Sequence, residues 1–255
     1  MNILAVGDIV GNDGVRYAVH QFKSLLLREH VDFTVVNGEN AADGKGLSAQ
    51  AADALFGAGA DVITLGNHAF AKKDVVSLLL NRPVIRPLNY PAGTVGYGCY
   101  VKTVKGKRIA VLNALGRVNI LNVDCPFRAV DKKLRELNGE ADITILDFHA
   151  EATSEKCAMG HYLDGRATCV FGTHTHVQTA DECVLPGKTG YISDVGMTGP
   201  VNSILGVRKE IIVQRFLTQL PQRFLLAEGK QKLCGAVFEI DDKTNQCVNV
   251  KRIQV

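Results

Sequence analysis

Short runs of apolar residues alternate with segments of helical periodicity along most of the chain. Short apolar runs between polar or glycine residues are typical of buried strands, and apolar positions three and four apart predict a helix. A strand at residues 3–6 precedes a helix whose apolar face contains Val15, Ala18, Val19, Phe22, Leu25 and Leu26. The same pattern predicts strands at residues 33–36, 61–65, 84–85, 143–148 and 167–171, and helices at residues 49–58, 75–80, 129–137 and 154–163.

Three paired segments depart from this alternation. Residues 98–104 and 108–113 flank Lys105-Gly106-Lys107, and residues 182–185 and 190–193 flank Pro186-Gly187-Lys188. Both are typical of β-hairpins. Residues 233–240 and 247–253 lie on either side of a polar stretch at the end of the chain. Strand–helix units combined with hairpins predict an α/β fold of mixed sheets covered by helices, in a single domain over residues 1–255.

The composition excludes several classes of protein. With 46% apolar and 22% charged residues the chain is ordinary for a globular protein, not a disordered one. The net charge is only +3, so we expect no stable binding of nucleic acid through bulk charge. No apolar run approaches the roughly 18 residues of a membrane helix, and the first residues do not resemble a signal peptide. The seven cysteines contain no Cys-x-x-Cys pair, which predicts free buried thiols and a cytoplasmic location.

Polar motifs follow five of the predicted strands. A single His-x-His pair is often incidental, and a single Asp at the end of a strand often only caps the following turn. Five motifs at five strand ends are much harder to explain in that way, since the carboxyl ends of parallel strands meet at the edge where ligands bind. The motifs are Asp8, Asn37-Gly38-Glu39-Asn40, Gly66-Asn67-His68, Asp147-Phe148-His149-Ala150-Glu151 and Gly172-Thr173-His174-Thr175-His176.

The residue types in these motifs favour metal chemistry. Oxygen and imidazole donors without a thiolate suit Mn, Fe, Zn, Co or Ni at a hydrolytic site. Seven donors exceed the needs of one ion but suit two ions that share a carboxylate. Two divalent ions would outweigh the two carboxylates in charge, which favours a hydroxide and an anionic phosphate ester as ligands. The seven candidate donors are Asp8, Glu39, Asn40, Asn67, His149, His174 and His176.

The motif series resembles that of calcineurin-like metallophosphoesterases, through Gly7-Asp8, Gly66-Asn67-His68 and residues 172–176. Two departures narrow the resemblance. Val10 stands where that superfamily usually has a histidine, and residues 37–40 replace its usual Gly-Asp. With the block at residues 147–156 and Gly196-Met197-Thr198-Gly199-Pro200, the chain resembles the YmdB-like branch of the superfamily from Asn2 to beyond Pro200.

The resemblance implies a four-layer α/β/β/α sandwich with two metal ions, iron first and manganese or zinc as alternatives. It further implies that one ion is bound by Asp8, Asn40 and His176, and the other by Asn67, His149 and His174. Glu39 would bridge them, and His68 would be the general acid. The implied activity is hydrolysis of 2′,3′-cyclic nucleotides, with 3′,5′-cyclic nucleotides as a further candidate, by a hydroxide held between the ions.

One further departure concerns the neighbours of His68. In the YmdB-like branch a Trp, and often an Asp or His, follow the Asn-His pair, whereas this chain has Phe70 and Ala71. No metal ligand is lost, so the departure bears on rate and substrate range. Arg86, Arg117 and Arg128 are candidates for holding a phosphate, but surface arginines are more often solvated and we leave them outside the site.

Other interpretations remain open at this point. Glu151 and Glu155 begin a predicted helix and are explained by its dipole, while by resemblance Thr198 and Gly199 line the mouth of the site. A broad phosphomonoesterase or a nuclease-like phosphodiesterase would use the same metals. A metal-holding regulatory or RNA-binding protein with little turnover is a third interpretation, and assembly into a homo-oligomer is left open. A metallo-amidohydrolase is excluded, because its His-x-His pair follows the first strand of a barrel that hairpins would interrupt.

Overall fold

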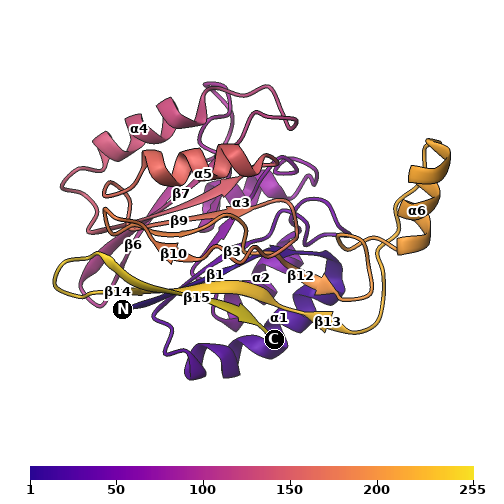
Figure 1. Ribbon diagram of the computed structural model, residues 1–255, viewed down its shortest axis with the longest axis horizontal. Coiled ribbons are helices and arrows are strands. Elements are labelled where there is room, and N and C mark those ends of the chain that lie inside the picture. Colours follow the sequence, from indigo (N-terminus) through magenta and orange to yellow (C-terminus); the bar gives the residue numbers. More distant parts are fainter.

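The computed structural model describes all 255 residues, which form two six-stranded mixed sheets and a small third sheet (Figure 1). The first sheet has the order β15 (Cys247–Gln254), β14 (Cys234–Ile240), β1 (Asn2–Val6), β3 (Phe33–Asn37), β4 (Val62–Thr64), β5 (Val84–Ile85). The second has the order β10 (Cys183–Val184), β11 (Gly190–Ile192), β9 (Cys169–Thr173), β8 (Ile143–His149), β7 (Lys107–Leu115), β6 (Cys99–Val104). The third has the order β13 (Gln231–Lys232), β12 (Met197–Pro200), β2 (Asp8–Ile9).

Six helices complete the fold. They are α1 (Gly11–Arg28), α2 (Ala49–Ala58), α3 (Val75–Asn81), α4 (Pro126–Glu136), α5 (Thr153–Tyr162) and α6 (Lys209–Thr218). None of them is both long and apolar enough to span a membrane. The predicted helices and hairpins are confirmed with small shifts of their ends. The largest shift is at α4, which begins at Pro126 rather than at residue 129, because proline is favoured in the first turn of a helix.

Three separate apolar clusters show that the fold has four layers. One cluster lies between the two large sheets and contains Phe33 and Phe171, both fully buried. A second joins the first sheet to α1, α2 and α3 and includes Phe22 and Leu55. A third joins the second sheet to α4 and α5 and includes Met159. The expected α/β/β/α arrangement is therefore confirmed.

Parallel strands of both sheets bring their carboxyl ends to one edge of the molecule. In the first sheet β1, β3 and β4 are parallel neighbours, and Asn37 pairs with Thr64 at the ends of β3 and β4. In the second sheet β7, β8 and β9 are parallel, and His149 pairs with Thr173 at the ends of β8 and β9. The loops that leave these ends carry the predicted motifs.

Two parts of the fold were not predicted from the sequence. The third sheet joins β2 to β12, with Met197 paired to Asp8, and these strands are too short for a period-2 pattern. Helix α6 belongs to an arm, residues 201–228, that projects away from the sheets (Figure 1). Only Ile212 of this helix is buried, so α6 has no apolar face packed against the core.

Candidate dinuclear metal site

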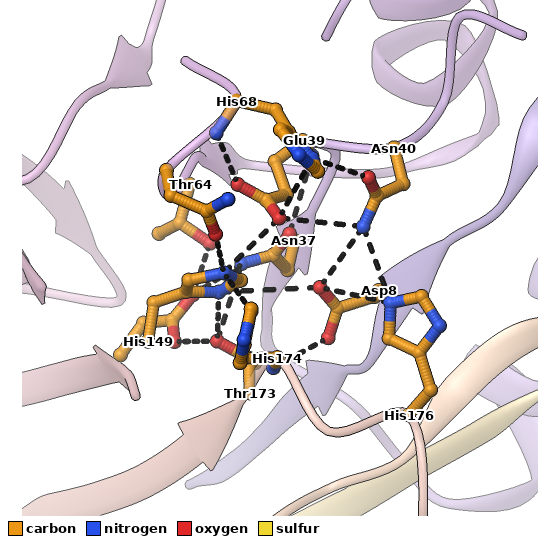
Figure 2. Close-up of polar contacts among 12 residues, drawn as sticks. Asp8, Asn37, Glu39, Asn40, Thr64, His68, His149, Thr173, His174 and His176 are labelled. Carbon is orange, nitrogen blue, oxygen red and sulfur yellow. Dashed lines mark hydrogen bonds and ion pairs between the residues drawn. The ribbon is translucent and has the colours of Figure 1, made fainter. Parts of the chain in front are cut away.

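His149, at the end of β8, is the centre of a first group of four donors (Figure 2). Its Nε2 lies 3.0 Å from Glu39 Oε1, 3.1 Å from Asn67 Oδ1 and 3.0 Å from His174 Nδ1. Ligand atoms of Glu39, His149 and His174 all lie within 4.8 Å of one another. Four lone-pair-bearing atoms that converge in this way form a mixed nitrogen and oxygen set of the kind transition metals prefer.

Asp8, Asn40 and His176 form a second, looser group. Asn40 Nδ2 lies 3.2 Å from His176 Nε2 and 3.5 Å from Asp8 Oδ1, while His176 Nε2 and Asp8 Oδ1 are 3.7 Å apart. Asn40 Nδ2 also donates to Glu39 Oε1 at 3.3 Å, so the Glu39 carboxylate lies between the two groups. The structure thus brings all seven predicted donors together in two neighbouring groups.

His68 lies at the rim of the site and is not part of either donor group. Its Nδ1 is 2.9 Å from Asn40 Oδ1 and 3.5 Å from Glu39 Oε1, and its backbone N–H donates to Glu39 Oε2 at 3.0 Å. The side chain is 30% exposed, whereas that of Glu39 is 1% exposed. His68 is therefore held against the donors while it remains open to a ligand from solvent.

Phe70 supports the loop that carries His68. Its ring packs edge-to-face against Tyr90, with the ring centroids 5.5 Å apart. The Tyr90 hydroxyl in turn donates to the Gly66 carbonyl at 3.5 Å. This aromatic contact shows that Phe70 has a packing role beside the site, even without the polar group that a Trp would offer at this position.

Beneath His149 lies a buried polar network that fixes the orientation of its ring. Thr173 Oγ1 is 2.8 Å from His149 Nδ1 and donates to Asp147 Oδ1 at 2.7 Å. Asn37 Nδ2 donates to Asp147 Oδ2 at 3.0 Å, and Thr64 also bonds to this carboxylate. Partners of this kind direct a histidine's other nitrogen toward a metal. Asn37, Asp147 and Thr173 belong to the predicted motifs, but no role was predicted for them from the sequence.

A buried ion pair holds the loop that carries His174 and His176. Asp194 Oδ2 accepts from Lys156 Nζ at 2.6 Å and from the Thr175 backbone N–H at 3.1 Å, and both charged side chains are almost fully buried. His174 and His176 have φ angles of 100° and 64°, in a region that L-residues rarely adopt. The ion pair and the His174 N–H bond to Asp8 Oδ2 at 3.1 Å offset that strain.

Two glycines are required by close approaches at the site. A Cβ atom on Gly66 would lie 2.3 Å from Glu39 Oε2 and 2.4 Å from the His149 ring. A Cβ atom on Gly172 would lie 1.8 Å from the Ser193 carbonyl oxygen. Glu39, His149 and Ser193 are all buried, so any side chain at these two positions would displace the donors or the β9 backbone.

The donors perturb one another's pKa values strongly in the metal-free protein. Burial alone would raise the pKa of Glu39, but the adjacent His149 holds it well below its usual range. Burial alone would lower the pKa of His149, but the neighbouring Glu39 and Asp8 raise it to about 9. The pKa of His174 falls to about 3 through burial and the charge of His149. The first group therefore binds one proton on His149, in a place where a metal ion would supply the same positive charge.

The Asn40 amide also bears on the fit to metal ions. As placed, its NH₂ group points at three acceptors, which are Asp8, Glu39 and His176. Exchange of the two ends of the amide would put Oδ1 in this position and the NH₂ group beside His68. Each group of donors then offers only lone pairs to its centre, so the residues present fit two metal ions.

Several candidates outside the seven donors have other roles. The Arg86 guanidinium donates to the carbonyls of residues 87, 94, 95 and 96, so it is committed to the backbone and not to a phosphate. Glu155 accepts from the backbone N–H groups of Arg117 and Val118 and so holds that loop, beyond any effect of the helix dipole. Glu151 lies 2.9 Å from His174 Nε2 and therefore supports a donor.

The expectation that Thr198 and Gly199 line the mouth of the site is wrong. Both are buried in β12, and the Thr198 carbonyl lies against Gly14 of α1. The close contact between this strand and α1 leaves them no access to solvent.

Comparison with known proteins identifies the family. Residues 4–253 match the model of the YmdB-like protein family. The chain belongs to the YmdB-like family. A relative from Bacillus subtilis, named 2′,3′-cyclic-nucleotide 2′-phosphodiesterase, is 46% identical over 256 residues, which cover 100% of this chain and 97% of the relative.

Two solved structures of related chains share the same fold. A hypothetical protein from Thermus thermophilus is 42% identical with a TM-score of 0.94, and the match covers 100% of this chain and 99% of that one. A novel phosphatase from Mycoplasma pneumoniae is 33% identical with a TM-score of 0.95, over 100% and 93% of the two chains. The resemblance derived from the motifs is confirmed at the level of family and fold.

Proposed function

We propose that this YmdB-like chain is a dinuclear metal-dependent phosphodiesterase that hydrolyses 2′,3′-cyclic nucleotides. The observation that carries the proposal is the convergence of seven oxygen and imidazole donors on two adjacent centres that share the Glu39 carboxylate. The substrate class is supported by the name of the Bacillus subtilis relative, which is 46% identical along the whole chain. A cyclic phosphate diester matches a site whose metals would leave it electron-poor.

The residues divide into two ligand sets with one bridge. Asn67, His149 and His174 would hold one ion, Asp8, Asn40 and His176 the other, and Glu39 would contact both. Iron, manganese and zinc all suit such ligands, with iron as our first candidate. Bound in this way, the two ions would supply positive charge to the phosphate oxygens and lower the pKa of a water molecule toward neutrality.

The residues of the chain then orient the substrate and move one proton. Water adds to phosphorus, the bond from phosphorus to O2′ breaks, and the product is a 3′-phosphate monoester. We assign to His68 the transfer of a proton to the departing O2′, because it lies at the rim and its Nδ1 lies 2.9 Å from the outer end of the Asn40 amide, which is the NH₂ group when Oδ1 faces the metal. This anchor leaves Nε2 as the nitrogen available to the substrate. Proton transfer of this type contributes about 10²–10⁴-fold to rate.

The test measures metal content and hydrolysis of 2′,3′-cyclic AMP together, for the wild type and for Glu39→Gln. For the wild type we expect about two metal ions per chain and turnover. The variant should lose metal binding and turnover, because the amide cannot replace a bridging carboxylate. Glu140→Gln, which alters an exposed residue far from the site, is the matched control and should behave as the wild type. No metal after reconstitution with Mn or Fe would overturn the proposal.

Two outcomes would favour the alternative functions. Two bound metals with turnover on p-nitrophenyl phosphate but none on cyclic nucleotides would indicate a phosphomonoesterase. Two bound metals with no turnover on either substrate would indicate a regulatory metal-holding protein.

A further inference from the structure

A basic groove lies between the projecting arm and the loop that follows Asn40. Its volume is about 850 Å³, and its walls come from residues 42–45, Lys72, Val207, Arg215 and residues 221–226. Two connections join the groove to the metal site. Residues 42–45 belong to the loop that begins at the donor Asn40, and His176 Nδ1 lies 3.0 Å from the Leu205 carbonyl at the base of the arm.

The charges of the groove are unbalanced. Four cations line it, against the single carboxylate of Asp43. Lys72 pairs with Asp43 at 3.2 Å, while Lys45, Arg215 and Arg223 form no ion pair anywhere in the structure. Unpaired cations at the wall of a cleft attract phosphate groups.

Aromatic surface accompanies these cations. The Arg215 guanidinium lies 5.1 Å from the centroid of the Phe224 ring, and Phe224 is 45% exposed. On α6, Phe216 is 73% exposed. Cations that follow a phosphate backbone and aromatic rings on which bases stack are the two elements that proteins use to bind single-stranded nucleic acid.

We propose that this groove binds the RNA chain on the 5′ side of a terminal 2′,3′-cyclic phosphate. The preferred substrate class is then an oligoribonucleotide with a cyclic end, whose terminal phosphate lies at the metal site while the preceding phosphates lie among Lys45, Arg215 and Arg223. This inference rests on the proposed function and specifies its substrate. RNA cleavage by attack of a 2′-hydroxyl leaves such ends, so a reaction of that class supplies the substrate.

The chemical step is the same at the end of an RNA as in a mononucleotide. Water adds across the phosphorus–O2′ bond, O2′ receives a proton, and the RNA ends in a 3′-phosphate. No oxidant or co-reactant is needed. The proposal revises our expectation that the chain does not bind nucleic acid stably. The cations come from four separate segments of the chain, so no basic stripe is visible in the sequence.

The experiment compares hydrolysis of 2′,3′-cyclic AMP with that of a tetraadenylate ending in a 2′,3′-cyclic phosphate, using the metal-loaded full chain. For the wild type in low salt, we expect kcat/KM to be at least about tenfold higher on the tetranucleotide, because its extra phosphates reach the groove. Arg215→Gln combined with Arg223→Gln should remove this advantage and leave kcat/KM on 2′,3′-cyclic AMP within about twofold, since neither arginine touches the donors or His68.

A matched control removes two charges elsewhere. Lys23→Gln combined with Lys243→Gln alters exposed residues of α1 and of the β14–β15 turn, neither of which lines the groove. This control should keep the tetranucleotide preference. Raising the salt concentration should reduce kcat/KM on the tetranucleotide less steeply in the arginine variant than in the wild type. In a plot of log kcat/KM against log salt concentration, the slope should be smaller by about 0.7 for each phosphate that the variant no longer neutralises.

The outcomes separate the two proposals. Equal kcat/KM on both substrates in the wild type would overturn the proposal that the groove binds RNA. A preference for the tetranucleotide that survives in the arginine variant would overturn it as well. Failure of the metal-loaded wild type to hydrolyse either substrate overturns the proposed function itself.

Discussion

The two halves of the metal site are built in different ways. Around His149, three ligand atoms lie 3.0–3.1 Å from Nε2, and the ring is fixed by Thr173 on the adjacent strand. Around His176, the distances are 3.2–3.7 Å, and the ring is tethered only to a carbonyl at the base of the arm. The register of β8 and β9 positions His149 and its partner Thr173 in the first half, whereas His176 in the second half lies on a loop with a φ of 64°. We therefore expect the first ion to bind the His149 half and the second to bind more weakly.

The largest effect should follow from replacing the central ligand of each half. His149→Ala should abolish activity and lower the stoichiometry below one tightly bound ion, because its Nε2 faces all the other donors of the first half. His176→Ala should also inactivate the enzyme but retain one tightly bound ion. Calorimetric titration of both metal-free variants with Mn²⁺ checks the difference. Equal stoichiometry in the two variants would show that the halves do not differ.

A smaller loss should follow from His68→Ala, because His68 contacts Glu39 and Asn40 without belonging to either half. We expect kcat on 2′,3′-cyclic AMP to fall by about 10²–10⁴-fold. Both ions should remain bound, which metal analysis of the same sample measures. Loss of one ion would instead make His68 a structural partner of Asn40.

Removing a supporting hydroxyl should weaken only the half that it supports. Thr173→Val deletes the bond to His149 Nδ1 and should weaken binding of the first ion by about 10–100-fold. Thr175→Val deletes a bond to Asp194 in the loop between His174 and His176, and should act mainly on the second ion. Stepwise titration with Mn²⁺ separates the two effects. The same loss on the same ion in both variants would contradict this division.

A change of pH perturbs the site without altering any side chain. The pKa of His149 is raised to about 9 in the metal-free protein, so its ring binds a proton at neutral pH, while the pKa of His174 is lowered to about 3. A metal ion must displace the proton on His149. Affinity for the first ion should therefore rise with pH by up to about tenfold per unit and level off near pH 9. Titrations between about pH 6 and 9 measure this, and an affinity that falls with pH would contradict the assignment.

The sequence was sufficient for the buried strands and for the grouping of the motifs at their ends because both depend on strong local patterns, whereas the four layers were implied by the family resemblance. Apolar runs located the buried strands, and the motifs at their ends converge, since parallel strands such as β8 and β9 end at one edge. The support beneath His149 was missed because Asn37 and Asp147 meet only through packing of the two sheets, 110 positions apart in sequence.

The arm and the third sheet could not be predicted, because neither has a strong local pattern of apolar residues. Helix α6 buries only Ile212, so its apolar residues do not trace a face directed at a core. Strand β2 has two residues and depends on Met197, far along the chain, for its pairing. Arg86 was considered as a phosphate ligand, and only the structure shows that its donors are used by backbone carbonyls.

The position of β1 has a consequence for how the protein is made. This first strand lies between β3 and β14, and the amino terminus donates to the Ile240 carbonyl at 2.8 Å. During synthesis one edge of β1 therefore waits without a partner until Cys234 and the residues after it have left the ribosome. Such non-local pairing slows folding and leaves an open strand edge in the nascent chain. The first sheet, whose strand β1 leads directly to Asp8, is therefore completed only late in the synthesis of each molecule.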